Sequence, residues 1–477
     1  MHLALKSAMS RIPYTNKVGE TLSSIADPAA AYSLRALGGG DPMVARVRRS
    51  SDDAEKDFTA SDMDSGSVAD WVNGKQDTTL PCDVASAAAA YSLRSVNSNY
   101  TGSVVRVRRS SDDAEKDFTA SDMGAALEDW VNEDVVAYQS DFSSGTNGWS
   151  HNVGSPSLTF SSVSNELNVT ATVNTNFQLV RSNTIEFGHL YSLTFEAFVE
   201  AGSGLAYWGV GAFHNKENTG NNISITEGVW QSVTLSFSRS SAGSSMRLAA
   251  FTTIDGDVTD AILNGKTVKL RNIEITQLTA DGHVTTWYDQ SGNGNNATQS
   301  TAGSQPKIVD GGAYLGELDF DGVDDQLDYP LSISTLNNTS SFVLAAFQNT
   351  TDNQFVLTVS GGSNNRWYSP IIWNGSYRFG YGASIDSINL GTPDENNHLF
   401  TATAGSTTAE GFIDGLSKGT QPSTSNALSD QSFIGAHTSS ISYPLNGSIS
   451  EIIIYDSDQS SNREAIETNI NNHYDIY

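Results

Sequence analysis

A tandem duplication near the amino-terminal end constrains the fold of this chain more than any other feature. The block RVRRSSDDAEKDFTASDM occurs twice without a change, at Arg46–Met63 and at Arg106–Met123. Flanking segments also match, with AAAYSLR at Ala29–Arg35 and again at Ala88–Arg94. Two copies are too few for a solenoid, which needs about three repeats. The duplication therefore predicts a docking or assembly element rather than a repeat array.

Length, charge and cysteine content limit the classes of protein that this chain can be. Its 477 residues suffice for about three domains. A net charge of −28 disfavours binding to nucleic acid or an anionic membrane, because both need Lys and Arg to neutralise phosphates. Cys82 is the only cysteine, so no intrachain disulfide can form. With no apolar run typical of a secretion signal or of a membrane helix, we expect folding in a reducing cytoplasm and release by lysis, as for a virus particle.

The order of sequence patterns predicts a mainly β fold in five segments. Short runs of alternating apolar and polar residues, punctuated by Gly, Asn and Ser, are typical of antiparallel sandwiches. Each repeat is expected to open with a short helix favoured by its alanine run. The expected segments are an anchor (Met1–Ala26), a docking repeat (Asp27–Cys82), a second repeat that begins a split sandwich (Asp83–Glu133), an inserted jelly roll (Asp134–Ala280) and a concanavalin-like or laminin-G-like sandwich (Asp281–Tyr477).

Strands and one helix are expected at particular places in the two large segments. In the jelly roll, whose YSLTF and VKLRNIEI strings resemble carbohydrate-binding modules, the expected strands include Ser192–Phe198 and Val268–Ile275. In the last segment they include Ser341–Phe347 and Ile449–Tyr455, with a hairpin turn at Asp414-Gly415. A terminal helix is expected at Arg463–Tyr474.

Two separated strings resemble one known catalytic domain. YSLRSVNSNYTGSVVRVRRSSDDAE at Tyr91–Glu115, followed by TTWYDQSGNGNNATQ at Thr285–Gln299, resembles fungal α-L-arabinofuranosidase B of glycoside hydrolase family 54. The string NGSISEIIIYDSDQSSNREAIETNI near the end resembles the closing part of concanavalin-like lectin sandwiches. In family 54 the two strings are nearly contiguous on such a sandwich. The resemblance therefore implies that the jelly roll is inserted into a split sandwich.

The carboxylates of that family do not reappear at the comparable positions. A retaining glycosidase needs two carboxyl groups about 5 Å apart. The region that compares with the family's nucleophile, Phe355–Asn365, contains no acid, and His437 stands where the family has its acid/base Asp. The resemblance thus implies that the fold is kept and hydrolysis is lost. The acidic stretch Asp319–Asp328 could supply another pair, but a structural turn is the favoured interpretation.

Aromatic rings and one polar loop are the candidate ligand sites. A flat ring can stack on a sugar while polar neighbours bond its hydroxyls, although core packing is the competing interpretation. The predicted sugar contacts are Trp149, Trp208, Trp367, Tyr368, Trp373, Tyr377 and Arg378. The predicted ligands of a calcium ion (Ca2+), the one cofactor considered, are Asp289, Ser291, Asn293 and Asn295, which alternate as in the first half of a calcium loop. A turn stabilised by side chains is the alternative for this loop.

These patterns together favour a non-catalytic virion protein. The YSLR…VRRSSDDAE and WYDQSGNGNNATQ strings also resemble segments of marine bacteriophage tail and virion proteins. We expect a tail fibre, head fibre or decoration subunit that docks on other virion proteins through its amino-terminal region, binds host-surface glycans and forms a homo-oligomer. The alternatives are a glycoside hydrolase acting on arabinofuranosyl or related polysaccharides and a structural decoration protein without a ligand.

Overall fold

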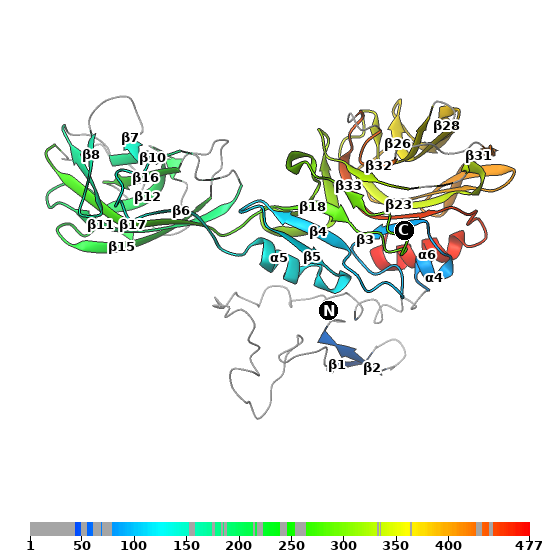
Figure 1. Ribbon diagram of the computed structural model, residues 1–477, viewed down its shortest axis with the longest axis horizontal. Helices are drawn as coiled ribbons and strands as arrows, with labels where there is room; N and C mark the ends of the chain where they lie inside the picture. The colour runs from blue at the N-terminus through cyan, green and yellow to red at the C-terminus, as the bar shows by residue number, and fades with distance from the viewer. Residues whose placement is uncertain are drawn as a thin grey trace. The chain divides into compact units, whose positions relative to one another are not determined.

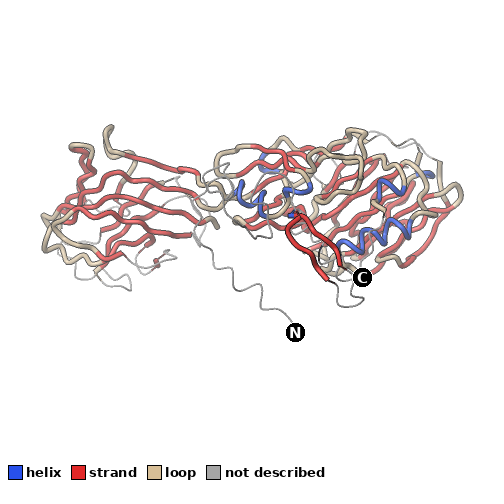
Figure 2. The backbone as a smooth tube through the Cα atoms, turned by 90° about the horizontal axis from the view of Figure 1, so that it is seen from below, coloured by secondary structure: helices blue, strands red, loops and turns tan. Residues whose placement is uncertain are grey.

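The computed structural model describes residues 43–48, 55–60, 68, 79–151, 158–173, 177–182, 185, 188–212, 215–216, 223–238, 246–252, 264–331, 333, 335–362, 365–425, 432–437 and 442–477. Figure 2 shows that strands dominate these parts of the chain. The chain divides into two compact units, residues 1–78 with 472–475 and residues 79–471 with 476–477. The expected anchor, Met1–Ala26, and most of the first repeat lie outside the described residues.

The first unit contains an antiparallel hairpin of β1 (Met43–Arg48) and β2 (Glu55–Thr59). Arg46 lies opposite Asp57 in the ladder. Its guanidinium donates two hydrogen bonds to the Asp57 carboxylate, at 2.5 and 2.6 Å. This two-pronged ion pair ties the strands together across a face of the hairpin.

The second copy of the repeat forms the same hairpin, from β4 (Val105–Arg109) and β5 (Glu115–Phe118). Arg106 lies opposite Asp117 and binds it at 2.7 and 2.8 Å. Acidic side chains of the hairpin therefore balance its arginines. Further ion pairs of this hairpin join Arg108 to Asp113 and Arg109 to Asp112, each at 2.7 Å, and Arg106 to Glu115 at 3.9 Å.

The expected helix over the alanine run is wrong. The helix α4 (Pro81–Val84) ends before the alanines, and Ala89–Ser92 forms strand β3. This strand pairs with β33 (Asn446–Tyr455), and all four of its residues are buried. Tertiary pairing to a buried apolar strand overrides the helix propensity of alanine, which amounts to a few tenths of a kcal/mol per residue.

The middle sandwich (β6–β17) consists of two antiparallel sheets, one holding β13-β12-β16-β10-β7 with β14 beside β12, the other β15-β11-β17-β9-β8 with β6 beside β17. Its strands are β6 (Val135–Ser140), β7 (Ser150–His151), β8 (Leu158–Val163), β9 (Glu166–Ala171), β10 (Phe177–Arg181), β11 (Leu190–Val199), β12 (Tyr207–Ala212), β13 (Asn215–Lys216), β14 (Ile223–Ser224), β15 (Trp230–Ser238), β16 (Met246–Phe251) and β17 (Thr267–Gln277).

Alternation along the strands builds the core of the middle sandwich. Every second residue of β11 is buried, as the period of a strand requires when only one face meets the core. Trp208 of β12 meets Phe177 of its own sheet and Phe195 of the opposite sheet, with ring centroids 5.9 and 5.1 Å away. The expected strands Ser192–Phe198 and Val268–Ile275 are confirmed within β11 and β17.

The C-terminal sandwich (β3–β5 and β18–β33) is a continuous antiparallel network of strands. Its later strands are β18 (Gly282–Trp287), β19 (Ala297–Thr298), β20 (Lys307–Asp310), β21 (Ala313–Asp321), β22 (Leu327–Tyr329), β23 (Ser340–Phe347), β24 (Gln354–Phe355), β25 (Leu357–Gly362), β26 (Asn365–Trp373), β27 (Ser376–Gly382), β28 (Ser384–Gly391), β29 (His398–Ala404), β30 (Thr408–Ile413), β31 (Leu416–Pro422), β32 (Ser432–Ile434) and β33. Short helical turns η1 (Ala120–Asp122), η2 (Ala302–Ser304) and η3 (Leu336–Asn338) punctuate it.

Strands β23 and β33 are buried on both faces, which explains their continuous apolar runs. Helix α6 (Arg463–Tyr474), confirmed at the expected residues, lies along the outer side of their sheet (Figure 1). Its Ile466 and Ile470 are buried. The hairpin turn expected at Asp414-Gly415 is also confirmed, because both residues have positive φ between β30 and β31.

Strands on either side of the middle sandwich in sequence pair with each other. Strand β4 pairs with β18, and β3 pairs with β33. Residues 89–118 thus share a sheet with residues 282–455. We interpret these pairings as a sandwich split by an insertion, and the five segment boundaries stay a prediction.

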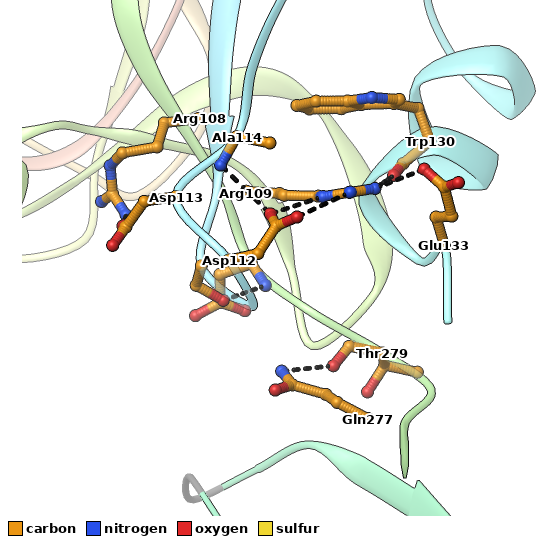
Figure 3. A network of polar contacts seen from close by, with 11 residues as sticks. Arg108, Arg109, Asp112, Asp113, Ala114, Trp130, Glu133, Gln277 and Thr279 are labelled. Carbon is orange, nitrogen blue, oxygen red and sulfur yellow. Dashed lines mark hydrogen bonds and ion pairs between the residues drawn. The ribbon is translucent and has the colours of Figure 1, made fainter. Parts of the chain in front are cut away.

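A polar network holds the second hairpin against helix α5 (Ala125–Val131), where the chain leaves for the middle sandwich (Figure 3). Besides Asp112, Arg109 binds the Glu133 carboxylate at 2.6 Å and the Trp130 carbonyl at 3.0 Å. Its guanidinium also stacks on the Trp130 ring, 5.1 Å from the centroid. One buried arginine therefore joins the turn, the strand and the helix.

Candidate functional site

Five aromatic rings gather on the C-terminal sandwich and form what we call the His437 cluster: Phe355, Tyr368, Trp373, His437 and Tyr443. Phe355 is at its centre, with ring centroids 4.6 Å from His437, 5.1 Å from Tyr368 and 5.7 Å from Tyr443. The Trp373 and Tyr443 rings stand almost perpendicular, at 82° and 5.3 Å.

Strand pairing brings these residues together from distant parts of the sequence. Phe355 lies opposite Ile371 of β26, and its backbone amide donates to the Tyr443 carbonyl at 3.1 Å. The backbone amide of His437 donates to the Ser442 carbonyl at 3.0 Å, which closes the segment after β32. Strand pairing and backbone hydrogen bonds therefore fix the positions of these residues.

The cluster has a buried base and an exposed rim. Phe355 and Tyr368 have no exposed surface, whereas Tyr443 is 40% exposed. Trp373 and His437 are half-buried. The rings available to a ligand are consequently those of Trp373, His437 and Tyr443, supported from beneath by the other two.

The polar groups of the cluster are uncharged near neutral pH. The Nε2 atom of His437 lies 3.1 Å from the Tyr368 hydroxyl. Burial lowers the pKa of His437 below its usual value, and the positive charge of Arg366 lowers it further. Burial raises the pKa of Tyr368. A neutral imidazole has one donor and one acceptor nitrogen, as sugar hydroxyls require. The buried Tyr368 phenol holds the His437 ring in place through their hydrogen bond.

Positions that the family resemblance singled out lie together in this cluster. Phe355 begins the region expected to compare with the nucleophile, and its ring contacts that of His437, the expected counterpart of the acid/base. The residues there are aromatic or imidazole, so this arrangement offers stacking and neutral hydrogen bonding. The sequence signal for Tyr443, a ring just after a Ser-rich segment, was too weak to single it out.

Most of the rings predicted as exposed sugar contacts are buried, so that expectation is wrong for Trp149, Trp208, Trp367, Tyr368 and Tyr377. Trp149 and Trp208 pack in the middle core. Trp367 contacts Phe379 and donates through Nε1 to Ser341 Oγ at 3.1 Å. The cause is strand alternation, which turns these side chains into the core between two sheets.

Three of the predicted contacts do belong to the region of the His437 cluster. Tyr368 is its buried hydrogen-bonding base, and Trp373 lies at its half-buried rim. Arg378 is half-buried on β27, opposite Ile371, which packs with Phe355 and Tyr368. Cross-strand neighbours share a face of the sheet, so Arg378 lies on the same side as the cluster.

The loop considered for calcium is hydrogen-bonded to the backbone at β3 and just before it. The Asp289 carboxylate accepts four hydrogen bonds, from the amides of Ala90, Ser291 and Asn295 and from the Ser291 hydroxyl, at 2.8–3.0 Å. Asn293 and Asn295 both donate to the Ala88 carbonyl, at 3.1 and 2.8 Å. The donors already occupy the Asp289 oxygens, so these contacts support a stabilised turn and give the calcium interpretation no support.

The acidic stretch between β21 and β22 is a tight turn. Asp321 accepts from the amides of Val323 and Asp324, and its own amide donates to Asp325 at 3.0 Å. Burial, together with the negative charge of Asp321, raises the pKa of Asp325 to about 7. Asp325 is only 5% exposed. Its carboxyl therefore serves the turn, in agreement with the favoured interpretation.

The described residues contain neither a metal-binding cluster nor a membrane-spanning helix. Across these parts of the chain, no group of three or more His, Cys, Asp or Glu side chains could hold a metal ion. Among the same residues, no helix has the length and apolar character to span a bilayer.

Comparison with known proteins gives distant structural similarities only. No family model and no curated protein matches the chain. The CBM22-1 xylan-binding domain of Xyn10C from Paenibacillus barcinonensis is 16% identical, with 31% of this chain and 96% of that chain covered, at a TM-score of 0.23. Domain 4 of AbnA, a GH43 extracellular arabinanase from Geobacillus stearothermophilus, is 14% identical, with 38% and 91% covered, at 0.28. Domains LG4-5 of the mouse laminin alpha1 chain are 14% identical, with 65% and 93% covered, at 0.24. Similarities this weak carry no argument about function.

Proposed function

We propose that this chain is a non-catalytic glycan-binding protein and that the His437 cluster is its binding surface. The observation that carries the proposal is the pair of rim rings, Trp373 and Tyr443, beside a neutral His437–Tyr368 hydrogen bond. Sugars present apolar C–H faces and polar hydroxyl edges. A site for them combines flat rings with a few fixed polar groups.

The perpendicular rim rings suit a single sugar unit. One ring can lie flat against the C–H face of a pyranose or furanose while the other contacts its edge, because the two planes meet at 82°. His437, whose ring centroid is 6.0 Å from that of Tyr443, then lies within reach of a hydroxyl. Arg366 adds a cation nearby, which favours glycans that carry an acidic group.

The cluster is held ready for a ligand. Phe355 contacts all three rim rings from its buried position. A ring that is already fixed loses little conformational entropy on binding, so more of the contact free energy appears as affinity. Single-site affinity in such a shallow, solvent-facing cluster is still expected to be modest.

The proposal includes loss of hydrolysis. Cleavage by the retaining mechanism needs a carboxylate nucleophile and a second carboxyl as acid/base. The region expected to compare with the nucleophile, Phe355–Asn365, contains no acid, and His437 stands at the position expected to compare with the acid/base. With its pKa lowered, His437 is a neutral imidazole at neutral pH and lacks the acidic imidazolium proton that a general acid gives to a leaving group.

We infer a virion as the setting of this binding, with the chain as a tail fibre, head fibre or decoration subunit of a bacteriophage. The duplicated hairpin supports this setting. Among the described residues, its first copy is a separate two-stranded sheet that does not pair with the strands of the C-terminal sandwich. Many copies on one particle would turn weak glycan sites into tight attachment through avidity. Detection of the chain in purified particles by mass spectrometry tests the setting.

Glycan-array screening of the intact chain, followed by calorimetric titration of the best ligand, tests the binding site. We expect Trp373→Ala and Tyr443→Ala each to weaken binding by about two- to tenfold, since stacking on one ring contributes about 0.5–1.5 kcal/mol. The matched control is Trp230→Ala, which removes a half-buried tryptophan of the middle sandwich and should leave the affinity unchanged.

Three outcomes would contradict the proposal. Binding that is lost in the Trp230 variant but kept in the Trp373 variant would move the site to the middle sandwich. An array without hits would favour a structural decoration protein. Release of reducing sugar from an arabinofuranosyl substrate would restore the glycoside hydrolase alternative.

A further inference from the structure

We propose that the first hairpin, β1–β2, accepts a β-strand from a different polypeptide along the outer edge of β1, and that this strand has the chemistry of β18. The proposal concerns assembly and is independent of glycan binding. It rests on a comparison of two hairpins with one sequence inside the same chain.

The two hairpins have the same geometry. From Arg46 and Arg106 onward their sequences are identical, and both ladders pair the repeated arginine with the repeated aspartate. The next pairs also correspond, with Val47 opposite Lys56 and Val107 opposite Lys116. The hairpin is therefore a property of the repeated sequence, formed in both settings.

In the second copy, β18 covers the outer edge. Gly282 lies opposite Arg109, Val284 opposite Val107 and Trp287 opposite Val105. Backbone bonds extend the ladder at both ends, from Ser110 N to the Asp281 carbonyl and from Tyr288 N to the Val104 carbonyl, each 2.9 Å.

Side chains of the repeat also recognise β18 and the segments next to it. The Tyr288 hydroxyl donates to Asp117 at 2.7 Å, and Arg108 donates to Gln305 Oε1 at 2.8 Å. Asp57 and Arg48 are the corresponding residues of the first copy. The first hairpin thus contains the same recognition groups for a strand of this type.

Burial differs between the copies at the same valine. Val107 has no exposed surface, whereas Val47 is half-buried. Among the described residues, β1 pairs only with β2. Addition of a strand to β1 would bury Val47 as β18 buries Val107, and strand addition to a sheet edge is an established mode of recognition.

The chain has two hairpins but one strand of the β18 type, which indicates that the strand added to β1 comes from another polypeptide. The sequence contains two hairpins but only one GHVTTWYDQ strand. A second copy of the chain could lend its β18 only by releasing its own β4. That exchange would place Ala45 where Val105 is fully buried, with less apolar contact. A strand from another polypeptide carries no such cost.

The strand that fits favours a small residue beside Val47. A Cβ atom added to Gly282 would lie 3.1 Å from Val107 Cγ1, the counterpart of Val47 Cγ1, while its other close neighbours, Val309 and Val131, lie outside the hairpin. The partner strand therefore favours glycine at this position, followed by β-branched residues and then a tyrosine that reaches Asp57.

A fluorescein-labelled peptide of residues 280–299, titrated into the intact chain and followed by anisotropy, tests the proposal. We expect saturable one-site binding. In the second hairpin the Arg109 amide donates to Ala114 inside the hairpin, whereas the amide of the next residue, Ser110, donates to the strand at the outer edge. Amides alternate in this way along a strand, so the Arg108 amide and the amide of its counterpart Arg48 point to the outer edge. Arg48→Pro removes this donor at an edge that tolerates proline and should weaken binding at least about tenfold. Arg48→Ala, which keeps the amide, should lose less.

Peptide variants test the same contact without altering the protein. Gly282→Val and Tyr288→Phe in the peptide should each weaken binding several-fold, the first by crowding Val47 and the second by removing the hydroxyl that reaches Asp57. If the Arg48→Pro chain binds the peptide as tightly as the unaltered chain does, the peptide has replaced β18 beside β4, and the proposal is overturned. Failure of the peptide to bind the unaltered chain would overturn it too. Dimers of the intact chain that Arg48→Pro dissociates in sedimentation equilibrium would make a second copy the occupant, which also overturns it.

Discussion

At the residue scale, environment decides what a side chain does. Two tryptophans of the same strand differ in burial: Trp367 is fully buried, whereas Trp373 lies at the half-buried rim of the His437 cluster. They are on the same strand, separated by an irregularity in pairing between Tyr368 and Ile371. Residue type predicted that aromatic rings matter here, but which of them meet solvent depends on strand register.

Asp325→Asn should stabilise the fold at alkaline pH. The folded-state pKa of Asp325, about 7, exceeds its unfolded value, so the ionised form is disfavoured in the fold. The associated stability is present in acid and is lost as pH rises from about 4 to about 7. Asparagine cannot ionise and keeps an acceptor for the Asp321 amide.

The expected gain in unfolding free energy from Asp325→Asn is on the order of 4 kcal/mol at pH 8, since the folded-state pKa lies about three units above the unfolded value and each unit corresponds to about 1.4 kcal/mol. At pH 4 the difference should vanish. Urea denaturation at both pH values measures it, with exposed Asp352→Asn as the control. A difference that does not change with pH would contradict this account.

At the element scale, a short sequence can specify its own structure when its contacts are local. The repeated hairpin forms twice with one register because its turn, its arginine–aspartate pairs and its alternation all lie within the block. The alanine run lacks such local contacts, so its partner β33 makes it a strand. Helix propensity alone led to the opposite expectation.

Arg109→Lys should loosen the attachment of the second hairpin to α5. Lysine cannot bind Asp112 and Glu133 together or stack flat on Trp130. Hydrogen bonds to charged groups contribute about 1.5–3 kcal/mol, so we expect a loss of about 2 kcal/mol in unfolding free energy, measured by urea denaturation.

The matched control for this attachment is Arg106→Lys on the same strand. Arg106 also forms a two-pronged ion pair, but its side chain is 42% exposed against 10% for Arg109. An exposed pair contributes about 0–1 kcal/mol. Equal losses in both variants would show that burial of the network is not what stabilises it.

At the scale of the whole molecule, the described chain has two large cores. One lies in the middle sandwich and includes Leu193, and the other lies in the C-terminal sandwich and includes Leu357. Each core has its own set of paired strands. Elements with separate cores can unfold separately even when one is inserted into the other.

Calorimetry of the intact chain should therefore resolve at least two unfolding transitions. Leu193→Ala and Leu357→Ala each remove a buried side chain, which costs about 2–5 kcal/mol. Each should lower the midpoint of one transition and leave the other in place. A single transition lowered equally by both variants would indicate one cooperative unit.

Some properties of this protein follow from its sequence alone, because they depend on neighbours along the chain. Short apolar or alternating runs bounded by turn residues predicted strands at β11, β17, β23 and β33. Helix α6 was expected at the residues where it lies. In each case the pattern needs only local geometry and the burial of one or both faces.

The tertiary structure decided which residues meet across the fold. Phe355, His437 and Tyr443 come together through strand pairing and closing segments that no local pattern encodes. The same pairing buries Trp208 and turns the oxygens of Asp289 toward backbone amides. The physical reason is that contact between distant residues depends on strand order and register, and these are set by the packing of whole sheets.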